Sequence, residues 1–272
     1  MLLSPHCTSE EEEMTNETPI PRKGEAKVVL ITGSSRGIGA ATAITAAAKG
    51  YDVAINYAGN KAAADSVAQQ VRDHGQNAIV VRGDVAREED VLAMFQAIDA
   101  EFGRLDALVN NAGVVDLVSK VEDMTAERMR RVFDVNILGA FMCAREAVKR
   151  MAVSKGGQGG SIVNLSSVAA RLGGPNTQVD YAASKAAVEV LNKGLAHEVG
   201  GDGIRVNAIR PGMIETDIHA SLGNPDRIKG LLHTVPMGRF GTASEVADAI
   251  VWLMSDEASY VNDAILDVSG GR

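Results

Sequence analysis

Residues 27–39 read KVVLITGSSRGIG, an apolar run that leads into a glycine-rich turn. The run Lys27–Ile31 is typical of a strand buried on both faces. Glycines follow at positions 33, 37 and 39, where a helical pattern begins. Glycine lets the backbone turn tightly and approach a pyrophosphate, and the helix N-terminus offers free N–H groups and the positive end of its dipole. The stretch predicts a dinucleotide-binding turn, with a tight turn that binds nothing as the alternative.

Short apolar runs and helical patterns alternate from this turn to the end of the sequence. Most runs are rich in Val, Ile and Leu without clean alternation, which indicates strands buried on both faces of a parallel sheet. Such alternation means βαβ units with right-handed crossovers. We therefore predict an α/β fold, a single doubly wound Rossmann-type domain whose seven-stranded parallel sheet has the order 3-2-1-4-5-6-7, with helices on both faces. The predicted strands are Lys27–Ile31, Asp52–Asn56, Ala78–Arg82, Ala107–Asn110, Ser161–Leu165, Ile204–Ile209 and Ala264–Val268, and the predicted helices are residues 37–49, 60–74, 88–102, 125–152, 180–200 and 243–254.

Two segments lie outside this alternation. Residues 1–24 are polar and acidic, so we expect a flexible tail before a single catalytic domain at residues 25–272, with Met14 as a possible natural start. Residues 211–240 form the longest excursion after a strand and contain three prolines. A long loop at the carboxyl edge of a parallel sheet commonly covers a site, so we predict a substrate lid there, with a structural connection as the alternative.

The composition disfavours several classes of partner. The formal charge of -8 argues against nucleic acid and anionic membranes, which attract basic surfaces. No apolar run approaches the roughly 18 residues that a membrane-spanning helix requires. Cys7 and Cys143 give neither a disulfide framework nor metal spacing, and the five histidines show no close ligand spacing. We expect a reduced, cytoplasmic protein whose chemistry needs no metal.

The end of the second strand indicates which dinucleotide binds. Sites that prefer NAD place an acid there against the ribose 2′-hydroxyl, whereas residues 55–58 read INYA and contain no acid. Arg36 supplies a positive charge beside the expected ribose, where it would attract a 2′-phosphate. The sequence therefore predicts NADP(H) in preference to NAD(H), unless Arg36 is only a surface charge.

Tyr181 and Lys185 lie four residues apart in the helical pattern of residues 180–200. This spacing places both side chains on one face of the helix. A free tyrosine has a pKa of about 10, and a neighbouring ammonium favours the phenolate and lowers that pKa. The pair is a candidate for proton transfer, although the same spacing is common by chance.

Other polar residues follow the strands in the same way. Ser167 comes just after the strand that ends at Leu165, and Asn111 and Gly113 come after the strand that ends at Asn110. Open α/β sheets bind their ligands at this carboxyl edge. A helix cap at Ser167 and a turn at Asn111 and Gly113 are the alternatives. Several such coincidences in the right order favour one site.

With these motifs in place, residues 27 to about 271 resemble the short-chain dehydrogenase/reductase family, especially its 3-oxoacyl-(acyl-carrier-protein) reductase and glucose dehydrogenase branches. The resemblance is specific as an ensemble. The residues that carry it are TGSSRGIG at 32–39, Asp84-Val85, NNAG at 110–113, Asn136, Ser167, Tyr181 with Lys185, and Pro211-Gly212.

The resemblance implies a role for each matching residue. Tyr181 would be the general acid in reduction and the general base in oxidation, and Ser167 would hydrogen-bond the substrate oxygen. Lys185 would hold the nicotinamide ribose and depress the tyrosine pKa, and Asn136 would order a water that links Lys185 to solvent. The cofactor-binding residues would be Gly33, Ser35, Arg36, Gly37, Ile38, Gly39, Asn56, Asp84, Val85, Asn111, Ala112, Gly113, Tyr181, Lys185, Pro211, Gly212, Ile214 and Thr216.

Three features depart from the family pattern. Fourteen positions separate Ser167 from Tyr181, one more than is usual in those branches, so the loop RLGGPNTQVD at 171–180 would shape a different pocket. The helix end at residues 196–200 lacks the basic residue that would help to dock an acidic carrier protein. Residues 261–263, VND, replace the Thr-Gly turn common in the family.

The sequence leaves the substrate open. A small carbonyl compound or secondary alcohol is expected, with Arg171 as a candidate for binding an acid group or for a subunit contact. A catalytically silent NADP(H)-binding sensor or scaffold is the alternative function. An epimerase or dehydratase would need a larger carboxyl-terminal region. The predicted pocket wall consists of Val114, Val115, Ala169, Leu172, Met213, Ile218 and His219.

Small apolar residues cover more than one face of the predicted helix 180–200. A helix that is apolar so far round is buried by something besides its own sheet. Packed with helix 125–152 across a two-fold axis it would form a bundle between subunits. We therefore predict a homodimer or, as the resemblance suggests, a homotetramer.

Overall fold

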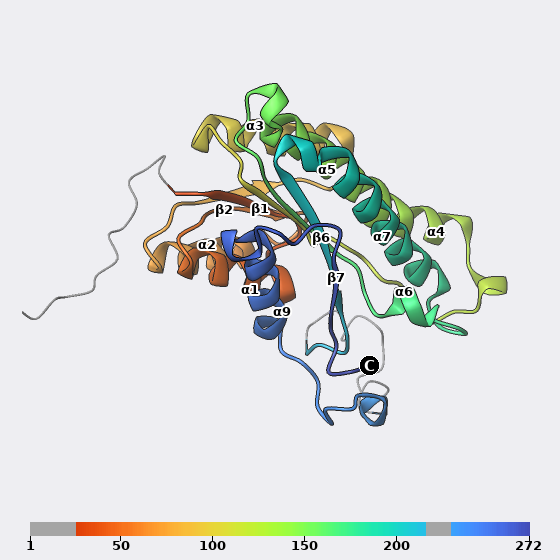
Figure 1. The fold of residues 1–272 in the computed structure, drawn as a ribbon. Coiled ribbons are helices and arrows are strands. Elements are labelled where there is room, and N and C mark those ends of the chain that lie inside the picture. Colours follow the sequence, from red (N-terminus) through yellow and green to blue (C-terminus); the bar gives the residue numbers. More distant parts are fainter. Residues whose placement is uncertain (1–25, 216–229) are drawn as a thin grey trace, which may run out of the picture.

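The computed structural model describes residues 26–215 and 230–272. One seven-stranded parallel sheet with the order β3-β2-β1-β4-β5-β6-β7 runs through this part of the chain, which confirms the predicted topology (Figure 1). The expected tail, the alternative start at Met14 and the middle of the expected lid lie outside the described residues. The strands are β1 Val28–Ile31, β2 Asp52–Tyr57, β3 Ala78–Arg82, β4 Ala107–Asn110, β5 Gly160–Leu165, β6 Ile204–Pro211 and β7 Ile265–Val268.

Helices cover both faces of the sheet (Figure 1). On one face lie α1 (Gly37–Ala48), α2 (Lys61–Asp73) and α9 (Ala243–Met254). On the other lie α3 (Glu88–Phe102), α4 (Ala126–Phe133), α5 (Gly139–Met151) and α7 (Val179–Val199), and the short α6 (Ala169–Leu172) packs against α7. Short 3₁₀ turns occur at Val121–Asp123, Val153–Lys155, Gly200–Asp202, Leu232–Thr234 and Asp256–Ala258.

Two apolar cores fill the space between the sheet and its helices. Val29 and Ile31 of β1 point into the core beneath α1, α2 and α9. Val28 and Leu30 point the opposite way, into the core beneath α3 and α5. The inner strands β1, β2 and β4 therefore bury both of their faces, which explains why their apolar runs lack alternation and why their positions were predictable.

The segment predicted as one helix at 125–152 is interrupted. A π-helical turn at Asp134–Leu138 separates α4 from α5. Close packing accompanies the turn, because a Cβ added at Gly139 would lie 2.7 Å from the Cγ2 of Val85. Such π turns often occur at functional sites, and this one carries the buried Asn136.

The unusual sequence before β7 has a structural role. The Asn262 side chain accepts a hydrogen bond from the N–H of Val206 (2.8 Å) and donates one to the carbonyl of Ala196 (3.1 Å). Asp263 has a φ of 58°, a left-handed conformation that glycine adopts more easily. Its carboxylate lies 3.1 Å from the Nε2 of His197. These residues tie the start of β6 to the end of α7.

Two further features concern membranes and metals. No helix in residues 26–215 or 230–272 is long and apolar enough to cross a bilayer. The same described residues contain no group of three His, Cys, Asp or Glu side chains that could hold a metal ion. Cys143 is buried and free, and burial raises the pKa of its thiol to about 12.

Candidate active site

The side chain of Asn56 supports the glycine-rich turn by hydrogen bonds. The N–H of Gly33 donates to the Oδ1 of Asn56 (2.9 Å), and the Nδ2 of Asn56 donates to the carbonyl of Gly83 (3.0 Å). The N–H of Ser34 donates to the Asn56 carbonyl (2.9 Å). Asn56 was predicted to bind the cofactor, and its buried side chain supports the turn that would bind it.

Asn111 holds the turn from the side. Its Nδ2 donates to the carbonyls of Thr32 (2.8 Å) and Gly33 (3.0 Å). The backbone N–H groups of Asn111 and Ala112 both donate to the hydroxyl of Thr32 (3.0 Å each). The predicted turn at residues 111–113 therefore braces the predicted phosphate turn.

The N-terminus of α1 is suited to an anion. No side chain caps it, and its first turn contains no acidic residue. Gly33 and Gly37 have φ values of 62° and 57°, which side chains rarely allow. A helix N-terminus with uncapped N–H groups favours a phosphate. The residues present therefore fit the pyrophosphate of a dinucleotide.

We expect Gly39→Ala to weaken NADPH binding. A Cβ at Gly39 would lie 2.5 Å from the Nδ2 of Asn111 and 2.7 Å from the carbonyl oxygen of Gly33, so the turn must move. Overpacking of this kind costs about 1–3 kcal/mol, which corresponds to roughly 5- to 150-fold in the dissociation constant measured by fluorescence titration. Gly194→Ala is the control, because a Cβ there meets nothing within 4 Å. Equal affinities for the two variants would contradict the close fit.

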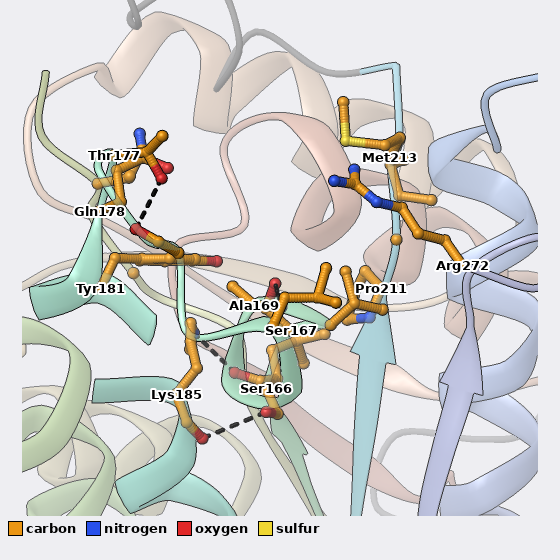
Figure 2. Close-up of a pocket in the computed structure, with 18 of the residues that line it drawn as sticks. Ser166, Ser167, Ala169, Thr177, Gln178, Tyr181, Lys185, Pro211, Met213 and Arg272 are labelled. Atoms are coloured by element: carbon orange, nitrogen blue, oxygen red, sulfur yellow. Dashed lines mark hydrogen bonds between the residues drawn. The ribbon is translucent and has the colours of Figure 1, made fainter. Parts of the chain in front are cut away.

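Three predicted catalytic side chains meet at the carboxyl edge of β5. Tyr181 lies in the first turn of α7, and Lys185 lies one turn later. Ser167 follows β5, and the phenol end of Tyr181 points toward its side of the pocket (Figure 2). The Oγ of Ser167 accepts the N–H of Ala169 (3.1 Å), and the neighbouring hydroxyl of Ser167 acts to lower the pKa of Tyr181. The N-cap of α6 is Val168 and has no side-chain cap, so Ser167 is not the cap of that helix. Ser167 lines the pocket beside Tyr181, and its role toward a substrate stays a prediction.

Lys185 is buried against the end of β5. Its Nζ donates to the carbonyl of Leu165 (2.7 Å) and lies 5.7 Å from the centre of the Tyr181 ring. A Cβ at Gly113 would lie 3.3 Å from this Nζ and 3.5 Å from the Oδ1 of Asn136. Lys185 and Asn136 therefore both border Gly113, as the predicted site requires.

Asn136 lies in the π-helical turn, and two hydrogen bonds link its side chain to the backbone of Val114. Its Oδ1 accepts the N–H of Val114 (2.8 Å), and its Nδ2 donates to the Val114 carbonyl (2.9 Å). The same Nδ2 donates to the Oγ of Ser184 (2.9 Å). Asn136 thus joins α7 to the segment after β4, and its predicted role toward a water and Lys185 stays a prediction.

The pKa of Tyr181 differs from the expectation. Burial raises the pKa of Tyr181 above its ordinary value of 10.0, and the hydrogen bond from Ser167 opposes this only in part. Lys185 is itself desolvated, which lowers its pKa to about 8. In the protein without a cofactor, Lys185 therefore does not lower the pKa of Tyr181 as expected. A neutral phenol is suited to donating a proton rather than removing one.

Other predicted residues line or support the same edge. Val85 is buried after β3, and the Oδ1 of Asp84 accepts the N–H of Ala86 (3.0 Å). A Cβ at Gly212 would lie 2.7 Å from the Cα of Ser269, so the chain passes close to the end of β7 there. Thr216, Ile218 and His219 lie outside the described residues.

A pocket of about 400 Å³ opens beside Tyr181 and Ser167 (Figure 2). Of the predicted wall, Val115, Ala169, Leu172 and Met213 line it. Val114 is not among its lining residues. Sequence reasoning did not predict several of the remaining lining residues, namely Gly174, Pro175, Thr177, Gln178, Leu231 and Arg272. Four of these belong to the loop at 171–180, which the sequence analysis expected to shape the pocket as a whole because of its extra residue, without naming these four positions.

Arg171, which was considered for binding an acid group, is engaged elsewhere. Its guanidinium forms an ion pair with Asp267 (3.0 Å) and donates to the carbonyl of Arg272 (2.9 Å). Arg171 therefore supports the backbone at Arg272 in this chain.

The start of α7 is anchored by a buried ion pair. The Nε of Arg128 in α4 donates to Asp180 (2.8 Å), and its NH1 donates to the carbonyl of Leu117 (2.7 Å). The other carboxylate oxygen of Asp180 accepts the N–H of Tyr181 (2.9 Å). The pair thus links α4, the segment after β4 and the backbone of Tyr181.

Comparison with known families agrees with this geometry. The sequence model described as enoyl-(acyl carrier protein) reductase matches residues 33–272. The chain is a short-chain dehydrogenase/reductase. This short-chain dehydrogenase/reductase is therefore an oxidoreductase, and its family implies a nicotinamide cofactor.

Named relatives match nearly the whole chain. An uncharacterized oxidoreductase, YgfF of Escherichia coli K12, is 52% identical over 245 residues, which cover 90% of this chain and 99% of the relative. The 3-oxoacyl-[acyl-carrier-protein] reductase FabG of Staphylococcus aureus Mu50 is 37% identical, with 90% and 97% covered. The crystal structure of levodione reductase aligns with a TM-score of 0.83 at 32% identity, covering 90% of this chain and 96% of the other.

Proposed function

We propose that this enzyme is an NADP(H)-dependent reductase that transfers a hydride between the nicotinamide and a carbonyl or secondary alcohol of a small substrate. The observation that carries the proposal is the convergence of Tyr181, Ser167 and Lys185 at one pocket. Retention of these residues, together with Asn136, argues against a silent sensor or scaffold.

The proposed reaction is easiest to follow in the reductive direction. Bound NADPH supplies the hydride that reaches the carbonyl carbon. Tyr181, whose raised pKa keeps the phenol protonated at neutral pH, donates its proton to the carbonyl oxygen as charge develops there. Ser167 donates a hydrogen bond to the same oxygen. The product is the alcohol, and the tyrosine then regains a proton from solvent.

Lys185 and Asn136 act around this step. The Nζ of Lys185 uses one hydrogen bond on Leu165, which leaves two N–H groups for the nicotinamide ribose. Its positive charge stabilises the phenolate that remains after proton donation. Asn136, held by Val114 and Ser184, lies at the same junction and would order the water through which the proton returns.

Two binding titrations test the proposed preference for NADPH over NADH. Arg36 is exposed next to the turn, and we expect NADPH to bind roughly tenfold or more tightly than NADH because its 2′-phosphate meets this guanidinium. Arg36→Ala should lose roughly 10- to 100-fold in NADPH affinity, the range of a charged hydrogen bond, and leave NADH unaffected. Lys49→Ala, an exposed cation at the other end of α1, is the control. Equal binding of both cofactors by the wild type would contradict NADP(H) preference.

The second test measures catalytic turnover. Consumption of NADPH with a panel of ketones and aldehydes would support the reductase. Tight NADPH binding without turnover of any panel member would favour the sensor. A substrate bound to a carrier protein, as named for the FabG relatives, is disfavoured because the helix end at 196–200 lacks a basic residue for docking.

Assembly and location complete the proposal. Leu138, Phe141 and Val190 are 52%, 47% and 73% exposed on the face formed by α5, α7 and the π turn. We propose that this face is buried in a homodimer or homotetramer, which light scattering would detect. A monomer at micromolar concentration would contradict it. The free thiol of Cys143 accords with the proposed cytoplasmic location.

A further inference from the structure

Arg272 places a cation at the wall of the catalytic pocket. Its guanidinium lies beside Met213 and faces the pocket, across from Thr177 and Gln178 (Figure 2). Partial burial lowers the pKa of this arginine without removing its charge. Arg272 takes no part in the chemistry proposed above, so its position calls for a separate explanation.

The backbone that carries Arg272 is firmly held. The main-chain oxygen of Arg272 accepts hydrogen bonds from Arg171 (2.9 Å) and from the Oγ of Ser269 (3.1 Å). The turn before it is packed closely, because a Cβ at Gly270 would lie 2.9 Å from Val235 and one at Gly271 would lie 3.0 Å from Pro236. The guanidinium is thus presented by a fixed turn.

Neighbouring carboxylates are already paired with other arginines. Asp267 pairs with Arg171 (3.0 Å) and with Arg210 (3.4 Å), and Glu189 pairs with Arg210 (2.6 Å). Within residues 26–215 and 230–272, no hydrogen bond or ion pair engages the Arg272 guanidinium. Arg272 therefore differs from the two arginines around it.

The charged side chains that line the pocket within the described part of the chain are both cationic. The described lining includes the cations Lys185 and Arg272 and no acidic residue. The rest of the wall is mainly apolar, with polar contacts from Ser167, Thr177 and Gln178. A cation in a partly desolvated pocket whose described lining contains no acidic residue favours an anionic ligand.

The turn that would hold the cofactor phosphates lies after a different strand from Arg272. The phosphate turn follows β1, whereas Arg272 follows β7, and β4, β5 and β6 lie between these strands. Four strand spacings of about 4.8 Å separate the two strand ends by roughly 19 Å. Arg272 is thus placed to meet a substrate group rather than the pyrophosphate or the 2′-phosphate.

We propose that Arg272 recognises a carboxylate of the substrate, so that the enzyme reduces small oxo acids or oxidises the corresponding hydroxy acids. The planar guanidinium fork matches a carboxylate with two parallel hydrogen bonds. This proposal rests on the reductase function proposed above and adds the chemical class of its substrate. Arg272 selects the substrate, and Tyr181 and Ser167 act on its carbonyl group.

The first experiment measures binding without turnover. Enzyme saturated with NADP⁺ is titrated calorimetrically with short 2-, 3- and 4-oxo acids and with the methyl ester of each. At the chain length that fits, the wild type should bind the acid roughly 10²-fold more tightly than the ester, as expected for paired charged hydrogen bonds. Arg272→Gln should remove this preference, and Arg272→Lys should keep part of it. Arg130→Gln, which changes an exposed arginine of α4, should leave it intact.

The second experiment measures NADPH-dependent reduction of the same pairs. We expect kcat/KM for the acid to fall roughly 10²-fold in Arg272→Gln, with less than about a threefold change for the ester. Unchanged NADPH affinity in the variant would show that it folds and that Arg272 does not contact the cofactor. Equal handling of acid and ester by the wild type, or an acid preference that survives in Arg272→Gln, would overturn the inference while the reductase stands. Failure of the wild type to bind NADPH or to reduce any ketone would instead overturn the proposed function.

Discussion

Tyr181→Phe should lower the rate of carbonyl reduction by roughly 10²- to 10⁴-fold, the range of a lost general acid. The variant removes one hydroxyl, and the ring keeps its place beside Lys185. NADPH affinity should therefore change by less than about twofold, since the phosphate turn is untouched. Single-turnover kinetics with saturating NADPH would measure the loss directly. Retention of more than about a tenth of the wild-type rate would show that another group donates the proton.

The control for this variant is Tyr260→Phe, because Tyr260 is fully exposed and remote from the pocket.

The pH dependence of the reduction rate gives a second test of the proposed roles. Reduction needs a protonated Tyr181, whose pKa burial raises above 10.0, so this group remains competent throughout the neutral range. Lys185 has a pKa lowered to about 8, and its charge is lost as the pH rises through that value. Wild-type reduction should therefore begin to decline near pH 8 through Lys185, well before the tyrosine titrates.

The fold was predictable because its strands depend on local composition. Runs such as Val28–Ile31 bury both faces, so an unbroken apolar segment identifies them without knowledge of their neighbours. The phosphate turn was equally visible, since its glycines are required by φ values and close contacts at fixed spacing. The candidate residues Tyr181, Lys185 and Ser167 followed from their places after a strand and one turn apart on α7, and their separate roles came from the family resemblance.

What escaped prediction depends on contacts between distant segments. The π turn at Asp134–Leu138 interrupts a continuous helical pattern, and its close packing on Val85 comes from the end of β3. Arg272 reaches the pocket only because its turn packs against Val235 and Pro236 and is held by Arg171. The raised pKa of Tyr181 likewise reflects burial in the assembled pocket, which no spacing reveals.

Arg128→Ala should destabilise the enzyme by about 3–5 kcal/mol, because it leaves the Asp180 carboxylate buried without its partner. The side chains of Arg128 and Asp180 are only 12% and 2% exposed. For a chain of this size the loss corresponds to a decrease in Tm of roughly 5–9 °C. Calorimetry of the wild type and the variant, each at the same protein and cofactor concentrations, would measure it.

The matched control is Arg131→Ala on the same helix, which breaks an ion pair with Asp116. The Arg131 side chain is 53% exposed, so its loss should cost no more than about 1 kcal/mol. The double variant Arg128→Ala with Asp180→Ala removes the unpaired charge and should recover part of the stability. Because Asp180 also accepts the N–H of Tyr181, the recovered protein should still show a lower kcat with little change in KM. Similar Tm losses for Arg128→Ala and Arg131→Ala would show that burial of the Arg128–Asp180 pair is energetically unimportant. A wild-type kcat in the double variant would show that this pair does not position Tyr181.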